Sequence, residues 1–226
     1  MNQDAYIIER RIVGFGLGIR KKSYLFVKRL FDIIVSLVGI VFLIPVTIVL
    51  KIAYMLTGDF HRIFFVQERI GKNGKKFKFL KFRSMVPNAD EILFRTMELD
   101  AIVAEEYKKN KKLKNDPRIT KLGRFIRKTS IDELPQLINV LIGDMSMIGN
   151  RPYLPREVED MGTYYEDIVK TKPGLTGYWQ VNGRSKTSFD DRLKLEKYYS
   201  DHASMVLDVK IFLKTFLVVL LRKGAR

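Results

Sequence analysis

The stretch IIVSLVGIVFLIPVTIVL, Ile33 to Leu50, runs for 18 residues without a charged side chain and is rich in Ile, Val, Leu and Phe. A run of this length and composition is typical of a helix buried in lipid. Pro45 lies past its middle, where a helix loses a backbone hydrogen bond and bends. Lys51 follows at once, without a small-residue cleavage site, so the sequence predicts a retained membrane segment rather than a signal peptide.

Basic residues flank this segment on both sides. They are Arg10, Arg11, Arg20, Lys21, Lys22, Lys28 and Arg29 before it, and Lys51, Arg62, Arg69 and Lys72 after it. Because basic flanks stay on the cytoplasmic side, both ends of the segment favour the cytoplasm. A re-entrant helix that bends at Pro45 and returns to the same leaflet satisfies both flanks. We favour it over two alternatives, a helix that crosses the bilayer and a core helix of a soluble protein.

The composition narrows the chemistry of partners and metals. The 226 residues include 41 Lys and Arg against 25 Asp and Glu, a formal net charge of +16, which favours partners that carry phosphate. The chain has no cysteine and two histidines, which excludes disulfides, a thiolate nucleophile and Cys-ligated zinc. A metal would therefore have oxygen ligands, and magnesium, bound by one or two carboxylates plus substrate phosphates, is the expected ion.

The rest of the chain predicts one small domain of the α+β class. Aromatic residues at 63–66 and 77–82 surround Lys72-Asn73-Gly74-Lys75, and Asn-Gly is a strong signal for a β-hairpin turn. Apolar spacing over 88–107 predicts a helix. The apolar stretch 205–221 predicts a C-terminal helix, which either lies at the membrane interface or packs on the domain core.

Two adjacent carboxylates, Asp132 and Glu133, stand near the expected start of a helix. Ser130-x-x-Glu133 matches a capping box, which is a purely structural interpretation. Pro135 conflicts with a helix capped at Ser130, because its missing N–H would fall inside the helix, and a later start places Asp132 at the cap. There the helix N-terminus and neighbouring basic residues, Arg127 among them, favour an ionised carboxylate. Such a carboxylate can attack phosphorus and form an acyl phosphate.

Two later stretches, 143–152 and 172–184, are dense in Gly, Pro and Arg. Loops of this kind let the backbone approach a ligand closely and direct arginines toward phosphate. Two ordinary structured turns explain the same composition equally well. Neither stretch matches the P-loop or the dinucleotide fingerprint, so neither identifies a ligand by itself.

Six blocks in their order along the chain resemble the bacterial sugar transferase family, the monotopic phosphoglycosyl transferases. The blocks are KRLFD (28–32), QERIG (67–71), KFRSM (81–85), DELPQL (132–137), GDMS (143–146) and GYWQVNGR (177–184). The resemblance extends from Lys28 to Lys223. It implies a small mixed α/β catalytic domain with a β-hairpin, a re-entrant membrane helix kinked near Pro45 and amphipathic interfacial helices. Larger family members have additional amino-terminal spans, so the chain resembles the minimal catalytic unit.

On this basis we divide the chain into four segments. These are a basic amphipathic segment 1–27, a re-entrant membrane helix 28–58, a catalytic domain 59–204 and a C-terminal interfacial helix 205–226.

The resemblance also implies the chemistry and the site residues. Asp132 is the expected nucleophile and Glu133 its partner, which either orients the metal or handles a proton, and both are expected to bind Mg²⁺. The expected reaction transfers a sugar 1-phosphate from a UDP-sugar to undecaprenyl phosphate and releases UMP through a covalent intermediate on Asp132. It would be the first membrane step in the assembly of a glycan. The residues that we assign to substrate phosphates are Arg151, Arg184, Lys81 and Arg127.

The expected partners are the UDP-sugar, undecaprenyl phosphate and anionic membrane lipids, at the cytosolic face of the cytoplasmic membrane. No nucleic acid is expected, because the sequence has none of the usual recognition motifs. A basic nonenzymatic protein that binds membranes or nucleic acid is the alternative, and only the net charge supports it. Direct transfer with both substrates bound together is a third interpretation. The sequence leaves open which sugar is transferred, which glycan is made and whether the chain forms a homo-oligomer.

One position departs from the family pattern. The family commonly has Gly-Pro-Arg-Pro where this chain has Gly149-Asn150-Arg151-Pro152. We therefore expect the shape of this loop to differ.

Overall fold

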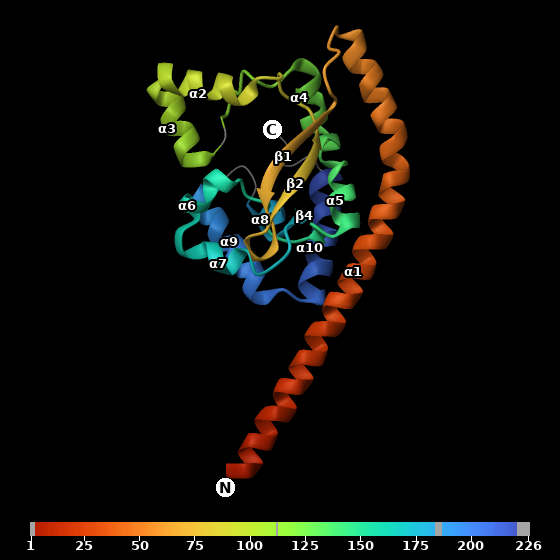
Figure 1. Ribbon diagram of the computed structural model, residues 1–226, viewed down its shortest axis with the longest axis vertical. Coiled ribbons are helices and arrows are strands. Elements are labelled where there is room, and N and C mark those ends of the chain that lie inside the picture. Colours follow the sequence, from red (N-terminus) through yellow and green to blue (C-terminus); the bar gives the residue numbers. More distant parts are fainter. Residues whose placement is uncertain (1–2, 112, 184–186, 221–226) are drawn as a thin grey trace.

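The computed structural model describes residues 3–111, 113–183 and 187–220. Helices dominate it, and two sheets of two strands each complete a mixed fold, which confirms the predicted α+β class. Figure 1 shows the long helix α1 running along one side of the domain that the other elements form. In chain order the elements are α1 (Gln3–Leu56), β1 (Phe64–Ile70), η1 (Lys72–Gly74), β2 (Lys76–Phe82), α2 (Ala89–Leu99), α3 (Ala101–Asn110), α4 (Lys121–Lys128), η2 (Ile131–Glu133), α5 (Gln136–Ile142), β3 (Ser146–Ile148), η3 (Pro155–Glu157), α6 (Val158–Met161), η4 (Gly162–Tyr164), α7 (Tyr165–Ile168), β4 (Gly174–Thr176), α8 (Tyr178–Asn182), α9 (Phe189–His202) and α10 (Met205–Leu220).

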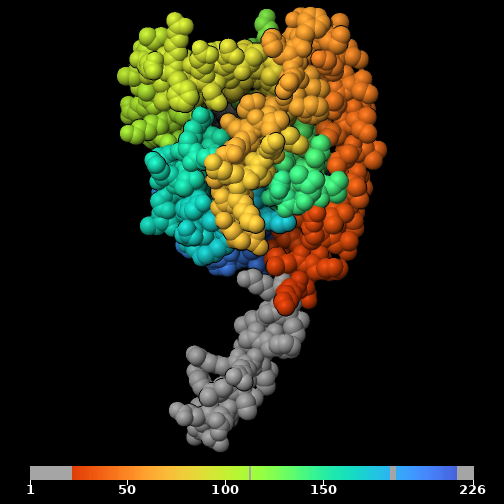
Figure 2. All heavy atoms as spheres, in the orientation of Figure 1, coloured from red at the N-terminus to blue at the C-terminus, as the bar shows by residue number. Residues whose placement is uncertain are grey.

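Helix α1 carries the apolar segment and continues through Pro45, so one helix spans the two amino-terminal segments that the sequence separated. Among the described residues, its part Lys22–Leu56 is the one helix long and apolar enough to cross a membrane. Only 17 % of its most apolar window is buried, which argues against the core helix of a soluble protein. Figure 2 shows the coloured part of α1, from Lys22 onward, along one margin of the molecule. The re-entrant path and the kink at Pro45 stay predictions.

The KRLFD block ties α1 to the domain through polar contacts. The ammonium of Lys28 lies 2.5 Å from the carboxylate of Asp208 in α10. Arg29 donates two hydrogen bonds of 2.7 Å, to the carbonyl oxygens of Val140 and Leu141 in the last turn of α5, where a helix supplies few partners of its own. Asp32 is buried and accepts a hydrogen bond of 2.8 Å from the backbone of Met147 in β3. The position of the apolar segment relative to the domain is therefore fixed at its amino-terminal end.

The β-hairpin is present, with β1 and β2 antiparallel over their full length. Asn73 and Gly74 both have positive φ, 57° and 75°, which is the backbone conformation that Asn-Gly favours in turns. Strand β1 continues to Ile70, four residues beyond the predicted end. On β2, Phe77 and Phe79 are buried between exposed lysines, one of which, Lys76, pairs with the opposite strand, so that part of the strand has a solvated face.

The single helix predicted over 88–107 is wrong, because the structure has two helices, α2 and α3. They meet at Asp100, whose extended backbone has φ −135° and ψ 105°. Its carboxylate accepts hydrogen bonds from the backbone of Ile102 at 2.9 Å and of Val103 at 3.2 Å. An aspartate that caps a new helix in this way stabilises the break more than it stabilises a continuous helix.

The C-terminal helix α10 has apolar residues on two faces. Asp208 and Ile211 are buried against the domain, whereas Val209, Leu213 and Leu217 are exposed. The helix therefore packs on the core, as the structural alternative predicted, and also presents an apolar surface to the outside. That surface is consistent with an interfacial helix, whose contact with lipid stays a prediction.

Gly123 allows α4 to lie very close to the backbone that follows β2. A Cβ at this position would lie 1.9 Å from the backbone oxygen of Ser84, the second residue after β2. We expect Gly123→Ala to push α4 away and to lower the free energy of unfolding by about 1–3 kcal/mol. Thermal melts in detergent check this, with Lys121→Ala on the exposed face of α4 as the control. An unchanged melting temperature for the alanine variant would show that the contact is not tight.

Candidate active site

Asp132 and Glu133 lie in one 3₁₀ turn, η2, that precedes α5. Helix α5 begins at Gln136 with Pro135 as its N-cap, where the missing N–H of proline costs nothing. Ser130 has φ 58° and makes no side-chain capping bond, so the capping box is absent. The expectation that Asp132 caps the helix is also wrong. Since Pro135 prevents an earlier start, the preceding residues tighten into i to i+3 hydrogen bonds instead.

Lys81, from the end of β2, joins the two carboxylates. Its ammonium lies 3.2 Å from Glu133 Oε1 and 3.5 Å from Asp132 Oδ2. Asp132 is 6 % exposed, whereas 41 % of the Glu133 side chain is exposed. The fold thus brings together three residues that the sequence assigned to the site, with one carboxylate buried and one open to solvent.

Arg127 is the fourth assigned residue in this neighbourhood. Its Nε donates a hydrogen bond of 2.8 Å to the Ser84 hydroxyl, and burial lowers the pKa of its guanidinium, while the charges of Asp132 and Glu133 oppose that change. Arg127 therefore interacts with the pair Asp132 and Glu133, here called the dyad, through its charge rather than through a hydrogen bond.

Burial also raises the pKa of Asp132, and the neighbouring charge of Glu133 adds to the increase, while Lys81 and Arg127 oppose it. The expectation that the surroundings of Asp132 favour its ionised form is therefore corrected. Desolvation exceeds the effect of the nearby cations, because the carboxylate is almost fully covered. A further cation next to Asp132 would favour ionisation.

The dyad fits magnesium by the chemistry of its donors. Asp132 and Glu133 supply hard oxygen ligands, and the described part of the chain holds no group of three or more His, Asp and Glu that could form a closed metal cage. Magnesium commonly binds through one or two carboxylates plus substrate phosphates and water. Within the described residues, the Asp132 carboxylate has one polar partner, Lys81 at a long 3.5 Å, so lone pairs remain for a metal.

The turn that carries the dyad packs beside the apolar helix through the residues that flank the two carboxylates. Ile131 and Leu134, on either side of it, pack into the hydrophobic cluster that contains Leu43 and Leu50 of α1. The same cluster includes Phe82, the neighbour of Lys81. At the far end of α1, the Tyr54 hydroxyl donates a hydrogen bond to the backbone oxygen of Arg83. The carboxylates and the lysine are thus fixed at the side of the segment most suited to lipid.

Arg151 belongs to a different cluster. Its guanidinium lies 5.7 Å from the ring centre of Trp179, and that of the buried Arg192 lies 4.4 Å from the same ring. The backbone N–H of Arg151 donates to Glu196, a fully buried carboxyl whose pKa burial raises to about 8. Within the described residues, no hydrogen bond or ion pair joins Arg151 to Asp132. The predicted phosphate role of Arg151 stays untested, and Arg184 lies outside the described residues.

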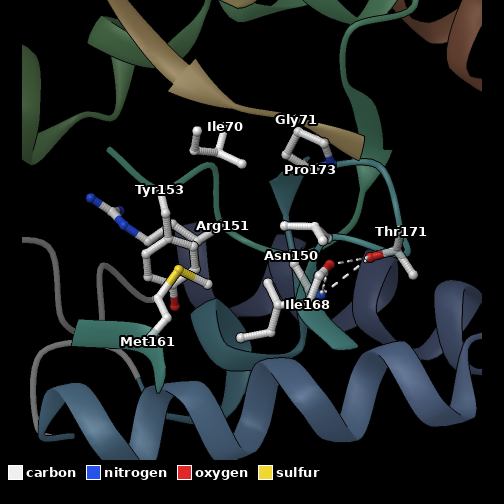
Figure 3. A pocket seen from close by; sticks show the side chains of 10 residues that line it. Ile70, Gly71, Asn150, Arg151, Tyr153, Met161, Ile168, Thr171 and Pro173 are labelled. Atoms are coloured by element: carbon white, nitrogen blue, oxygen red, sulfur yellow. Dashed lines mark hydrogen bonds between the residues drawn. The ribbon is translucent and has the colours of Figure 1, made fainter. Parts of the chain in front are cut away.

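Asn150, the residue that differs from the family pattern, makes contacts that hold the loop 149–152 in place. Its side-chain amide donates to Ile168 O at 3.2 Å, to the Thr171 hydroxyl at 3.2 Å and to the Ser200 hydroxyl at 2.6 Å. Figure 3 shows this amide directed toward Thr171 and away from the Arg151 guanidinium. A proline could make none of these bonds. The two glycine-rich stretches also contact each other, since a Cβ on Gly177 would lie 2.0 Å from the oxygen of Gly149. These close approaches are between backbone segments.

The sequence interpretation missed Asn139 and Arg192. Asn139 in α5 is fully buried, and both ends of its amide bind β2. A polar residue among the apolar residues of QLINVLI was the available signal, since a buried amide needs partners. Arg192 stacks on Trp179 from α9, the next helix in the chain, and no sequence motif indicates that contact.

Comparison with known proteins decides the family. The model of the family described as "Bacterial sugar transferase" matches residues 23–222. The chain belongs to the bacterial sugar transferase family. The matched range includes the apolar part of α1, the dyad and all of α10, so the apolar helix lies inside the region that the family model describes.

Three curated relatives of this sugar transferase are informative. The UDP-galactose-lipid carrier transferase of Erwinia amylovora is 42 % identical over 98 % of this chain and 46 % of the relative. The undecaprenyl-phosphate galactose phosphotransferase of Salmonella typhimurium is 44 % identical over 92 % of this chain and 43 % of the relative. The exopolysaccharide production protein ExoY of Sinorhizobium fredii is 37 % identical over 88 % and 87 %. The chain thus spans about half the length of the first two and most of the third.

Proposed function

We propose that this chain transfers a sugar 1-phosphate from a UDP-sugar to undecaprenyl phosphate, releases UMP, and so begins the assembly of an exopolysaccharide or capsule at the membrane. The names of the relatives support this choice, since they mention UDP-galactose, undecaprenyl phosphate and exopolysaccharide production. The observation that carries the proposal is the buried Asp132, next to Glu133 and Lys81, in a turn packed on the apolar helix α1. A water-soluble donor and a lipid acceptor can both reach a site at that boundary.

In the first step, an oxygen of the Asp132 carboxylate attacks the phosphorus that carries the sugar. The bond between this phosphorus and the bridging oxygen of the diphosphate breaks, and that oxygen leaves with UMP. The product on the protein is an acyl phosphate that still bears the sugar. The burial of Asp132 favours this step, since a desolvated carboxylate is a stronger nucleophile and water is excluded from the intermediate.

In the second step, a phosphate oxygen of undecaprenyl phosphate attacks the same phosphorus. The bond between Asp132 and phosphorus breaks, which restores the carboxylate and gives the sugar-bearing undecaprenyl diphosphate. The packing of this turn beside α1 supports a lipid acceptor, because the lipid phosphate would lie at the head-group level beside that helix.

Lys81 and Arg127 would stabilise the negative charge that spreads over the phosphoryl oxygens in both steps. Asp132 and Glu133 are the residues that would hold Mg²⁺, which would supply positive charge to the substrate phosphates. Glu133 is exposed enough to reach a metal while Asp132 reacts.

The proposed topology is a re-entrant α1, with the catalytic domain on the cytosolic face of the cytoplasmic membrane. The chain has no cysteine of its own, so single cysteines report sidedness without background. We expect Lys22→Cys and Arg62→Cys, at opposite ends of the apolar segment, to react with a membrane-impermeant maleimide from the cytosolic side only. Labelling of the two positions from opposite sides would establish a helix that crosses the bilayer.

The test of the function is UMP release in detergent micelles that contain undecaprenyl phosphate and magnesium, over a panel of UDP-sugars. We expect repeated turnover with one or a few of the sugars, which also identifies the substrate. Absence of UMP release with every sugar would overturn the proposal and favour the basic nonenzymatic membrane protein.

A further inference from the structure

Asn139 connects the helix after the dyad to the strand that carries Lys81. The Leu80 N–H donates a hydrogen bond of 3.0 Å to Asn139 Oδ1, and Asn139 Nδ2 donates one of 2.7 Å to the Lys78 oxygen. Asn139 is fully buried, so water cannot replace either bond. The side chain thus uses its acceptor and one donor on the backbone of the same strand.

These contacts lie on the edge of β2 that is not paired with β1. Strand β2 pairs with β1 in a two-stranded sheet, which leaves the other edge with unpaired backbone groups. Residues 78 and 80 alternate with Phe79, so their N–H and C=O groups face the same way, toward α5. The Asn139 amide, which has the same donor and acceptor as a peptide group, replaces a third strand there. One side chain therefore fixes the register of β2 against α5.

Lys81 lies between this contact and a second one. It follows Leu80 directly, and Ser84 comes three residues later. Two residues of α4 and its cap bind Ser84: the Thr120 N–H donates a hydrogen bond of 3.2 Å to the Ser84 backbone oxygen, and Arg127 donates one to the Ser84 hydroxyl. The dyad belongs to the turn that leads into α5, the helix of Asn139. A shift of β2 along α5 would therefore change the distances of 3.2 and 3.5 Å from Lys81 to the carboxylates directly.

We propose that Asn139 is a positioning residue of the transfer reaction, and that its amide sets the Lys81 ammonium against the Asp132–Glu133 dyad by fixing β2. The proposal rests on the proposed function, since it assumes that Lys81 acts on the substrate phosphates. A purely structural asparagine would also stabilise the fold. In that case the loss of kcat on its substitution would be the same whether or not Lys81 is present.

The test is a double-mutant cycle on UMP release with Asn139→Leu, Lys81→Met and the double variant, at a temperature where each variant is folded. We expect Asn139→Leu to lower kcat by about tenfold to a hundredfold, because small misplacements at a reacting centre have effects of this size. The double variant should be no slower than Lys81→Met alone. Losses that multiply in the double variant would overturn the proposal, as would an Asn139→Leu enzyme with the kcat of the parent.

A matched control and a second readout separate positioning from stability. Val140→Ala, at the next buried position of α5, removes packing but neither hydrogen bond. The fold loss of kcat that it causes should therefore multiply with the fold loss that Lys81→Met causes. Amide hydrogen exchange should become faster at Leu80 in Asn139→Leu and stay slow in Val140→Ala. Unchanged Leu80 exchange would overturn the positioning role. If Asn139→Leu does not fold, Asn139→Ser, whose hydroxyl cannot reach both strand groups, takes its place.

The exchange measurement does not depend on activity. If the parent protein releases no UMP while the Leu80 amide still responds to Asn139→Leu, the proposed function fails and the anchoring of β2 stands. If the parent is active and the cycle is additive, the function stands and the positioning proposal fails.

Discussion

Asp132→Asn is expected to reduce UMP release by about 10⁴-fold or more, the size of loss seen when a residue that forms the covalent intermediate is removed. The amide has nearly the shape of the carboxylate but is a far weaker nucleophile toward phosphorus. Burial already disfavours the charge of Asp132, so the neutral variant should fold as well as the parent. The loss is therefore expected in kcat, with an unchanged melting temperature.

The control for this variant is Asp190→Asn. Asp190 is an exposed carboxylate on α9 whose partner is Lys194, 2.7 Å away, so its removal should leave UMP release unchanged. An Asp132→Asn protein that turns over like the parent would contradict the role of Asp132 as nucleophile.

Removal of magnesium is expected to have the second largest effect. The reacting phosphates carry several negative charges, while within the described site Lys81 and Arg127 are the cations assigned to them. EDTA should therefore lower UMP release by about 10³-fold, and added Mg²⁺ should restore it, because a bound metal supplies several kcal/mol of charge stabilisation. Full activity in EDTA would contradict the metal requirement.

Glu133→Gln identifies the ligand in that site. Loss of one carboxylate should raise the Mg²⁺ concentration for half-maximal rate by about tenfold to a hundredfold. Glu68→Gln is the control, since that exposed carboxylate pairs with Lys76 on the hairpin, 2.9 Å away. An equal Mg²⁺ requirement in Glu133→Gln and the parent would leave Asp132 as the metal ligand and assign Glu133 another task.

Local features of the fold could be predicted from the sequence because their causes are local. Asn73-Gly74 adopts the positive φ values that the residue types favour, and the hairpin follows from that turn. Ile33–Leu50 is apolar whatever it packs against. The helix break at Asp100 also has a local cause, but the sequence pattern does not reveal it. Two helices on either side of a cap have the same apolar period as one continuous helix.

Features that depend on distant contacts could not be predicted in the same way. Asp132 is buried in a turn whose residues Ile131 and Leu134 pack against α1 and β2, which come much earlier in the chain. This burial raises the pKa of Asp132. Arg151 was assigned to the dyad's substrate by resemblance. That role stays a prediction. The pairing of Asn150 with Pro173 continues the contact between β3 and β4, and Arg151 lies beside Trp179, a position that no local pattern indicates.

A reaction without the lipid acceptor tests the covalent intermediate on Asp132 directly. The protein is mixed with a UDP-sugar labelled in the phosphate next to the sugar, and released UMP and protein-bound label are measured together. We expect one equivalent of UMP, label on the peptide that contains Asp132, and loss of that label when undecaprenyl phosphate is added. No UMP and no adduct without acceptor, from a protein that turns over normally with it, would contradict the covalent intermediate and establish direct transfer.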